Sequence, residues 1–139
     1  MTTKEYLSQS FTLHRLIRAK ESRIQDLQDM KERTGRLLTG TRVQSSPKKD
    51  SMGDLIASYE ADCHKLLAIQ EEIAATIKTV SREDYRLILF ERYVNLKRWE
   101  DISADNDYSE KHAYKLHNAA LKMIKLKPNH THSHNKASA

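Results

Sequence analysis

The sequence predicts an all-α protein, in which a long antiparallel helical hairpin resembling a coiled coil is followed by a C-terminal helix-turn-helix unit of three short helices. Three observations support this fold class. The 139 residues include only three glycines and two prolines, too few turn residues for a β-sandwich, a barrel or a repeated βαβ array. Apolar residues recur every three or four positions over two long stretches, which is the period of a helix. Three shorter helical stretches follow in the last third of the chain.

The first predicted helix covers residues 4–38, which contain no proline and one glycine near their end. Its core-facing positions, taken three and four residues apart from Tyr6 to Leu38, are apolar in six of ten cases. Residues 39–51 combine Gly, Ser, Thr and Pro with three cationic residues. They are predicted to form a flexible linker that lets the next helix fold back on the first.

The second predicted helix begins at Ser51, its expected N-cap, with Asp54 in the first turn, where the helix dipole favours an acid. Eight of its nine core-facing positions are apolar and keep a regular four-three spacing, which is typical of a coiled coil: Met52, Ile56, Tyr59, Cys63, Leu66, Gln70, Ile73, Ile77 and Val80. Opposite net charges, +3 over residues 1–38 and −3 over residues 52–80, favour pairing of the two helices. We therefore predict a hairpin over residues 1–80 that serves interaction or oligomerisation.

The remaining sequence predicts three short helices. Ser81-Arg82-Glu83-Asp84 is a helix start signal, and Trp99 begins a second helix of two turns. Asn106-Asp107 then forms a turn, since both residue types tolerate the left-handed conformation. Ser109 is expected to cap a last helix that runs to about Lys125. This outline is that of a helix-turn-helix.

The predicted packing of this module is specific. Ile102 and Ala113 lie on either side of the turn, where the two helices must touch, and alanine is small enough to let the backbones approach. Trp99, Tyr85 and Tyr93 are expected to be packing residues. We assign residues 81–127 to the module and residues 128–139, which are polar and without periodicity, to a disordered tail.

Charge indicates a nucleic-acid partner. Residues 109–127 carry a net charge of +4, whereas residues 81–108 carry −2. Lysine can bind phosphates or guanine, and asparagine can pair with adenine. We predict that the outward face of the last helix contacts double-stranded DNA, with bases contacted by Lys111, Tyr114, Lys115 and Asn118, and the backbone by Ser109, Lys122 and Lys125.

Several short runs also carry a family resemblance: Leu89-Phe90-Glu91-Arg92-Tyr93, Trp99-Glu100-Asp101-Ile102, Tyr108-Ser109, Tyr114-Lys115-Leu116-His117 and Ala120-Leu121. Together they resemble the C-terminal helix-turn-helix of sigma factors, region 4, over about 40 residues. The whole order of elements resembles the small phage late-transcription regulators related to ArpU and RinA. The resemblance implies a phage or prophage regulator that binds DNA near promoters and acts on transcription by host RNA polymerase. The chain departs from the sigma pattern at Asn106 and Asp107, in place of an apolar residue and glycine, and at His117, in place of an apolar inward residue.

Other function classes receive little support. The sequence has no phosphate-binding glycine loop, HExxH motif or CxxC pair, so we expect no enzyme, cofactor or metal site. The histidines of the tract at residues 130–134 lack paired ligands, and Cys63 is expected to be a small buried group. Without an apolar run of membrane-spanning length or a signal-peptide core, we expect a soluble cytoplasmic protein.

Two alternatives to a transcriptional regulator stay open. One is a phage small terminase, a DNA-packaging protein that also combines such a module with helical oligomerisation. The other is a coiled-coil adaptor or inhibitor that binds host polymerase or another host protein. A homodimer formed through the hairpin would present two recognition helices to neighbouring half-sites.

Overall fold

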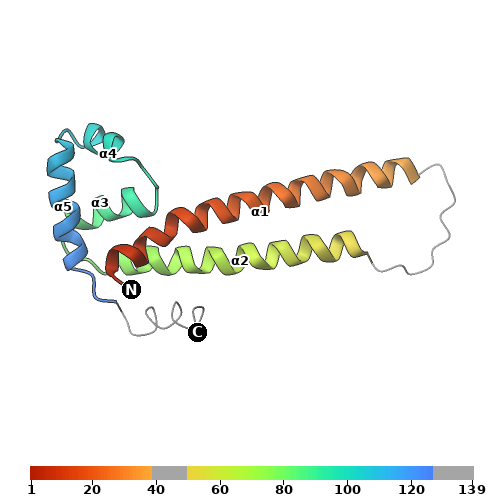
Figure 1. Ribbon diagram of the computed structural model, residues 1–139, viewed down its shortest axis with the longest axis horizontal. Helices are drawn as coiled ribbons and strands as arrows, with labels where there is room; N and C mark the ends of the chain where they lie inside the picture. Colours follow the sequence, from red (N-terminus) through yellow and green to blue (C-terminus); the bar gives the residue numbers. More distant parts are fainter. Residues whose placement is uncertain (39–49, 127–139) are drawn as a thin grey trace. The chain divides into compact units, whose positions relative to one another are not determined.

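The computed structural model describes residues 1–38 and 50–126, and every regular element among them is a helix. The five helices are α1 (Thr3–Leu38), α2 (Ser51–Lys78), α3 (Glu83–Tyr93), α4 (Trp99–Asp105) and α5 (Glu110–Lys122), as Figure 1 shows. The two long helices form an antiparallel pair, and α3–α5 pack together. The predicted fold class is therefore confirmed. Residues 39–49 of the predicted linker and the whole predicted tail lie outside the described residues.

The chain forms two compact units. Unit 1 comprises Met1–Leu13 and the chain from Ile69 onward, so it contains the start of α1, the end of α2, and α3–α5. Unit 2 is His14–Ala68. Both long helices therefore contribute residues to each unit.

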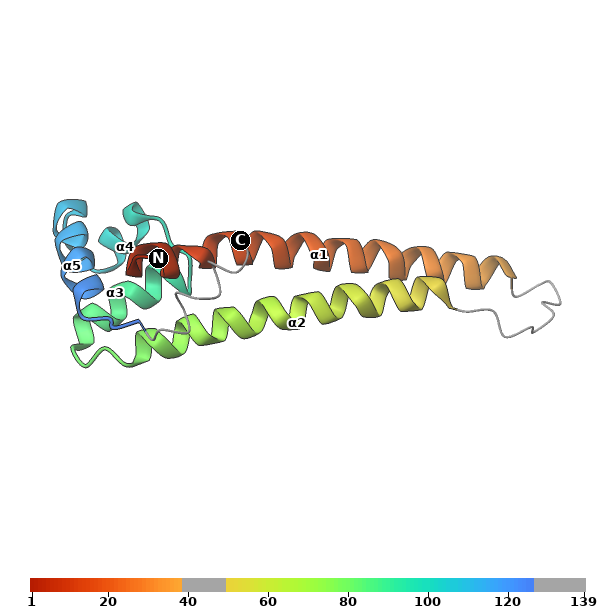
Figure 2. The same ribbon diagram turned by 60° about the horizontal axis from the view of Figure 1, so that its bottom comes forward.

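Unit 2 is held together by the predicted apolar positions of the hairpin. Ile17, Leu27, Ile56 and Cys63 are all less than a tenth exposed. Ion pairs join the two helices at Lys20–Asp62, 3.4 Å, and at Lys31–Asp50, 2.8 Å. Figure 2 shows the two helical segments side by side along this unit. The burial of Cys63 confirms its predicted role as a small packing group.

Not every predicted core position of the first helix is buried. Lys31 and Thr34, on the expected inward face, are exposed. Lys31 instead directs its ammonium group to Asp50 at the start of α2. The apolar stripe of α1 therefore weakens toward its C-terminal end, where the sequence offers polar residues at the inward positions.

Two predicted helix starts are wrong by one residue. The first is at α2, where Ser51 lies inside the helix and the Asp50 carboxylate accepts a hydrogen bond from the Gly53 N–H at 2.9 Å. Asp50 and Ser51 are both good N-cap residues, and the carboxylate also gains the Lys31 contact. The second is at α3, which begins after Arg82 without a side-chain cap, so Ser81 does not cap it.

The core of unit 1 combines side chains from all five helices. Its largest fully buried side chains are aliphatic and come from α1 (Leu7), α2 (Ile73, Ile77), α3 (Ile88, Leu89) and α4 (Ile102). α5 contributes Ala113 and Ala120, both fully buried. The predicted inward positions of Ile102 and Ala113 are thus confirmed. The short helices share their core with the ends of the long helices, because so small a module has too little apolar surface to form one alone.

Candidate nucleic-acid interface

The turn between α4 and α5 has the backbone of a tight helix-turn-helix corner. Asp107 has φ 56°, in the left-handed region, as predicted for this turn. Asn106 has φ −106° and is not left-handed, contrary to prediction. Its amide instead donates to the Ile102 carbonyl at 2.8 Å, which closes the end of α4. The Ser109 hydroxyl then accepts from the His112 N–H at 3.1 Å, so Ser109 caps α5 as predicted.

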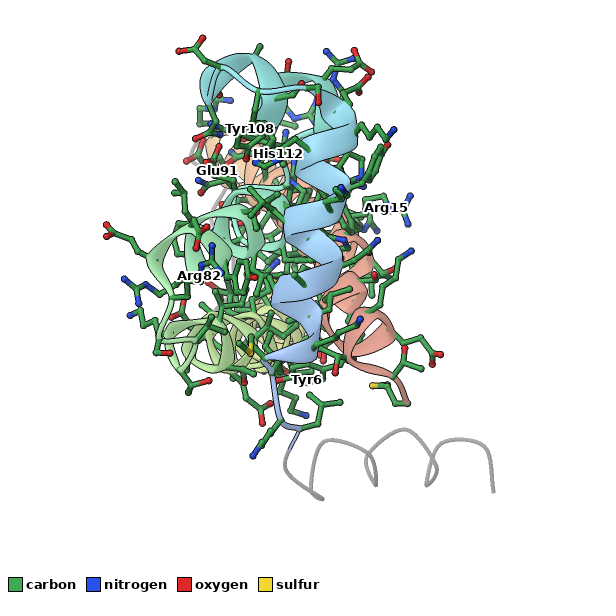
Figure 3. The ribbon with its side chains drawn as sticks, turned by 90° about the vertical axis from the view of Figure 1, so that its left-hand side faces the viewer. Tyr6, Arg15, Arg82, Glu91, Tyr108 and His112 are labelled. Carbon is green, nitrogen blue, oxygen red and sulfur yellow. The ribbon has the colours of Figure 1, made fainter. Side chains whose placement is uncertain are left out.

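The two faces of α5 differ sharply in exposure. Ala113, His117 and Ala120 point into unit 1 and are buried. Figure 3 looks onto α5, with Tyr108 and His112 near its first turn, where their rings lie 5.0 Å apart. The exposed face carries five predicted DNA-contacting residues: Lys111, Tyr114, Lys115, Asn118 and Lys122. One helix therefore gathers most of the predicted site on one surface.

One predicted site residue is placed differently. α5 ends at Lys122, so Lys125 lies three residues beyond the helix instead of within its last turn. Ile124, between them, is buried, and Lys125 remains exposed.

The lysines of this surface are not neutralised by nearby acids. Within the described part of the chain, no ion pair involves Lys111, Lys115, Lys122 or Lys125. Several acidic residues before the turn are paired locally, as in Lys97–Asp105 at 2.8 Å. The positive potential of α5 therefore faces solvent, where a polyanion could reach it.

A buried carboxylate supports the turn. Glu91 of α3 is 6 % exposed, and its two oxygens accept from Lys97 and from Asn106, each at 3.2 Å. Lys97 also donates a hydrogen bond to Asp105. The carboxylates of Asp105 and Glu91 raise the pKa of Lys97, and Asp105 has the larger effect. This network links α3 to the end of α4. It has no sequence signature, because an acid in an amphipathic helix is ordinarily exposed.

A second buried contact holds α5 against α3. The Tyr93 hydroxyl and His117 Nε2 lie 2.6 Å apart, and both side chains are 3 % exposed. The pKa of His117 is lowered to about 4, mainly by burial; a hydrogen bond to Asn118 acts in the opposite direction, and the charges of Lys4 and Arg92 add to the lowering. The imidazole is therefore neutral at physiological pH. Tyr93 is a packing residue, as predicted.

Trp99 lies at the edge of a pocket and is half-buried. Its ring lies 4.9 Å from Tyr114 and 4.8 Å from His117, with the Arg92 guanidinium 4.8 Å from its centre. Trp99 thus packs against neighbours within the module, but it lines the pocket and is not the fully buried core residue that was predicted. The pocket encloses about 310 Å³, and its lining joins the first turns of α1 to α3, α4 and α5: Lys4, Ser8, Phe11, Arg92, Tyr93, Trp99, Tyr114, His117 and Asn118. We call it the aromatic pocket.

Comparison with protein-family models, curated proteins and solved structures finds no match to this chain. Of the helices that the structure describes, none has an apolar stretch long enough to cross a bilayer.

Proposed function

We propose that the chain is a sequence-specific DNA-binding regulator of transcription, of phage or prophage origin, which acts in the bacterial cytoplasm with α5 in the major groove. The observation that supports this most directly is the exposed face of α5, whose lysines form no ion pair within the described residues. Such a surface favours a polyanion, because contact with phosphates releases condensed counterions.

The proposal gives the residues of this face two roles. Lys111, Tyr114, Lys115 and Asn118 lie along the exposed face of α5 and contact base edges. The backbone contacts are made by Ser109, Lys122 and Lys125. The Ser109 hydroxyl accepts the capping bond from His112, and its own hydrogen stays available to donate to a phosphate.

Selection of bound sites from random double-stranded DNA tests the proposal. A recovered consensus sequence that the protein retains in gel-shift titrations supports it. Affinity for that site should fall steeply between two salt concentrations, because phosphate contacts dominate the salt dependence. No retention of any DNA at low salt would overturn the proposal and favour the adaptor alternative.

Two substitutions separate the two roles. Lys115→Ala should cost about 1–3 kcal/mol at the selected site and relax the preference for one base pair. Lys122→Ala should weaken binding equally across sequences and reduce the salt slope by about one. Lys65→Ala, an exposed lysine of unit 2, is the matched control and should change neither. The far-ultraviolet helix signal should be the same in all three variants.

A second copy of the chain and host RNA polymerase are the further proposed partners. Unit 2 supports the first, since five large apolar side chains on it are at least 40 % exposed: Leu16, Met30, Leu37, Leu55 and Leu67. Contact with a second copy would remove this apolar surface from water. A dimer would require two half-sites about one DNA turn apart. A mass measurement in solution distinguishes this dimer from a monomer and from the larger ring expected of a small terminase.

A further inference from the structure

The aromatic pocket of unit 1 has walls suited to a flat ligand. Four of its lining residues are aromatic, namely Phe11, Tyr93, Trp99 and Tyr114. Aromatic faces stack on planar rings and exclude water from them. The volume of about 310 Å³ is at the lower end of the range of small-molecule sites, so it suits a ligand of one or two rings.

The charged groups of the pocket are both cationic. Lys4 and Arg92 line it, no aspartate or glutamate does, and neither cation forms an ion pair within the described chain. His117, also in the lining, is neutral at physiological pH. A pocket with aromatic side chains, two cations and no acid in its lining favours a ligand that carries a negative charge.

The Arg92 guanidinium is held in place before any ligand arrives. It lies 4.8 Å from the ring centres of both Phe11 and Trp99, and its Nη1 donates to the Lys97 carbonyl at 2.8 Å. These contacts leave other N–H groups of the guanidinium available, since arginine carries five donors. A planar cation fixed in this way can bind a carboxylate with little loss of side-chain entropy.

We propose that the aromatic pocket binds a small aromatic carboxylate, with its ring against the aromatic side chains of the lining and its carboxylate at Lys4 and Arg92. Tyr114 and Asn118 line this pocket and also belong to the exposed face of α5. A bound ligand therefore contacts two of the residues proposed to read DNA. It follows, if the proposed DNA-binding function is correct, that the ligand lowers the affinity for DNA.

The only tryptophan of the chain provides a direct readout. Trp99 lines the pocket, so its single indole N–H signal in a proton–nitrogen NMR spectrum should move on ligand binding. The probe is benzoate, compared with benzamide, which keeps the ring without the charge, and acetate, which keeps the charge without the ring. Benzoate should give a saturable shift with a Kd on the order of 1 mM, as expected for so small a ligand. Benzamide and acetate should bind at least about five times more weakly.

A variant with a matched control identifies the site. Lys4 is exposed near the start of α1, so Lys4→Gln should fold normally and weaken benzoate binding about tenfold. Lys111→Gln makes the same charge change on α5 outside the pocket and should leave the Kd unchanged. No movement of the Trp99 signal, an equal response to benzamide, or equal effects of the two variants would each overturn the ligand site.

A gel-shift titration tests the link to DNA separately. Saturating benzoate should weaken binding of the selected DNA site several-fold in the wild type, and clearly less in Lys4→Gln, with sodium acetate as the control for ionic strength. If benzoate moves the Trp99 signal while the DNA affinity stays constant, the link to DNA is overturned and the ligand site stands. If the protein binds no DNA at all, the proposed function fails, and the NMR titration still decides the ligand site.

Discussion

The Tyr93 hydroxyl lies 2.6 Å from Nε2 of His117, and the two residues join α3 to α5 inside unit 1. Both side chains are buried, so loss of either one removes a hydrogen-bond partner from a polar group of the other. A histidine at an inward position of α5, where an apolar residue is usual, is therefore accommodated by a partner on α3. This hydrogen bond joins the proposed recognition helix to α3.

Tyr93→Phe should lower the free energy of unfolding by about 1–2 kcal/mol, because it leaves a buried imidazole nitrogen without its partner. Urea denaturation followed by circular dichroism measures the change. Tyr85→Phe is the control: its hydroxyl accepts from Arg82 at an exposed position, and its removal should change stability by less than about 0.5 kcal/mol. Equal stabilities of the two variants would show that the Tyr93–His117 bond contributes nothing.

His117 should make stability depend on pH. Its pKa is about 4 in the folded chain and 6.5 in the unfolded chain, so the unfolded state binds more protons between these values. Stability is therefore complete above about pH 6.5 and falls as the pH drops toward 4. The difference in pKa corresponds to about 3 kcal/mol.

The contribution of His117 is measured by comparison with His117→Gln. Carboxylates also titrate at low pH, so the useful quantity is the difference between the two proteins in urea midpoint from pH 7 to pH 4.5. The wild type should lose more stability over this range than His117→Gln. Parallel pH profiles of the two proteins would contradict the lowered pKa.

The sequence predicted the parts of the fold that depend on local pattern. Apolar spacing identified both long helices, and the small size of Ala113 identified its close packing in the core of the module. The helical period also identified the outward positions of α5, where most of the residues predicted to contact DNA are exposed. These features are visible in sequence because each depends on one helix and its periodicity.

Features that join distant segments were not predicted. The aromatic pocket combines Lys4 at the start of the chain with Asn118 near its end, and no periodicity connects them. The burial of Glu91 likewise depends on Lys97 and Asn106, which reach it only once the chain has folded. Trp99 was expected to be a core residue, but the opening of the pocket leaves it half-buried. Tertiary contacts of this kind require the structure.

Glu91→Ala should lower the free energy of unfolding by about 2 kcal/mol. The substitution removes the acceptor for both Lys97 and Asn106 and leaves space where the carboxylate was. Arg98→Ala is a suitable comparison, since Arg98 forms ion pairs with Asp101 and Glu100 that are exposed to solvent and contribute at most about 1 kcal/mol. Thermal unfolding should therefore show a clear loss for Glu91→Ala and little change for Arg98→Ala; the reverse order would contradict a structural role for Glu91.

Substitutions of Asp107 test whether the backbone of the turn between α4 and α5 is strained. Its φ of 56° lies in the left-handed region, which glycine adopts without steric cost and which aspartate tolerates better than most residues. Asp107→Gly should therefore be as stable as the wild type or more stable by up to about 0.5 kcal/mol, since relief of strain offsets the greater entropy of the unfolded chain. Asp107→Val should lose about 1–2 kcal/mol, because a β-branched residue fits this conformation poorly.

The same glycine substitution at a helical position provides the contrast. Ala104 is an exposed residue of α4, and Ala104→Gly should cost about 1 kcal/mol through loss of helix propensity. Glycine is then tolerated at residue 107 and unfavourable three residues earlier, as expected for a left-handed residue at 107. If glycine destabilises both positions equally, Asp107 is not left-handed in solution and the turn has another backbone. Urea denaturation of the three variants and the wild type is sufficient to distinguish these outcomes.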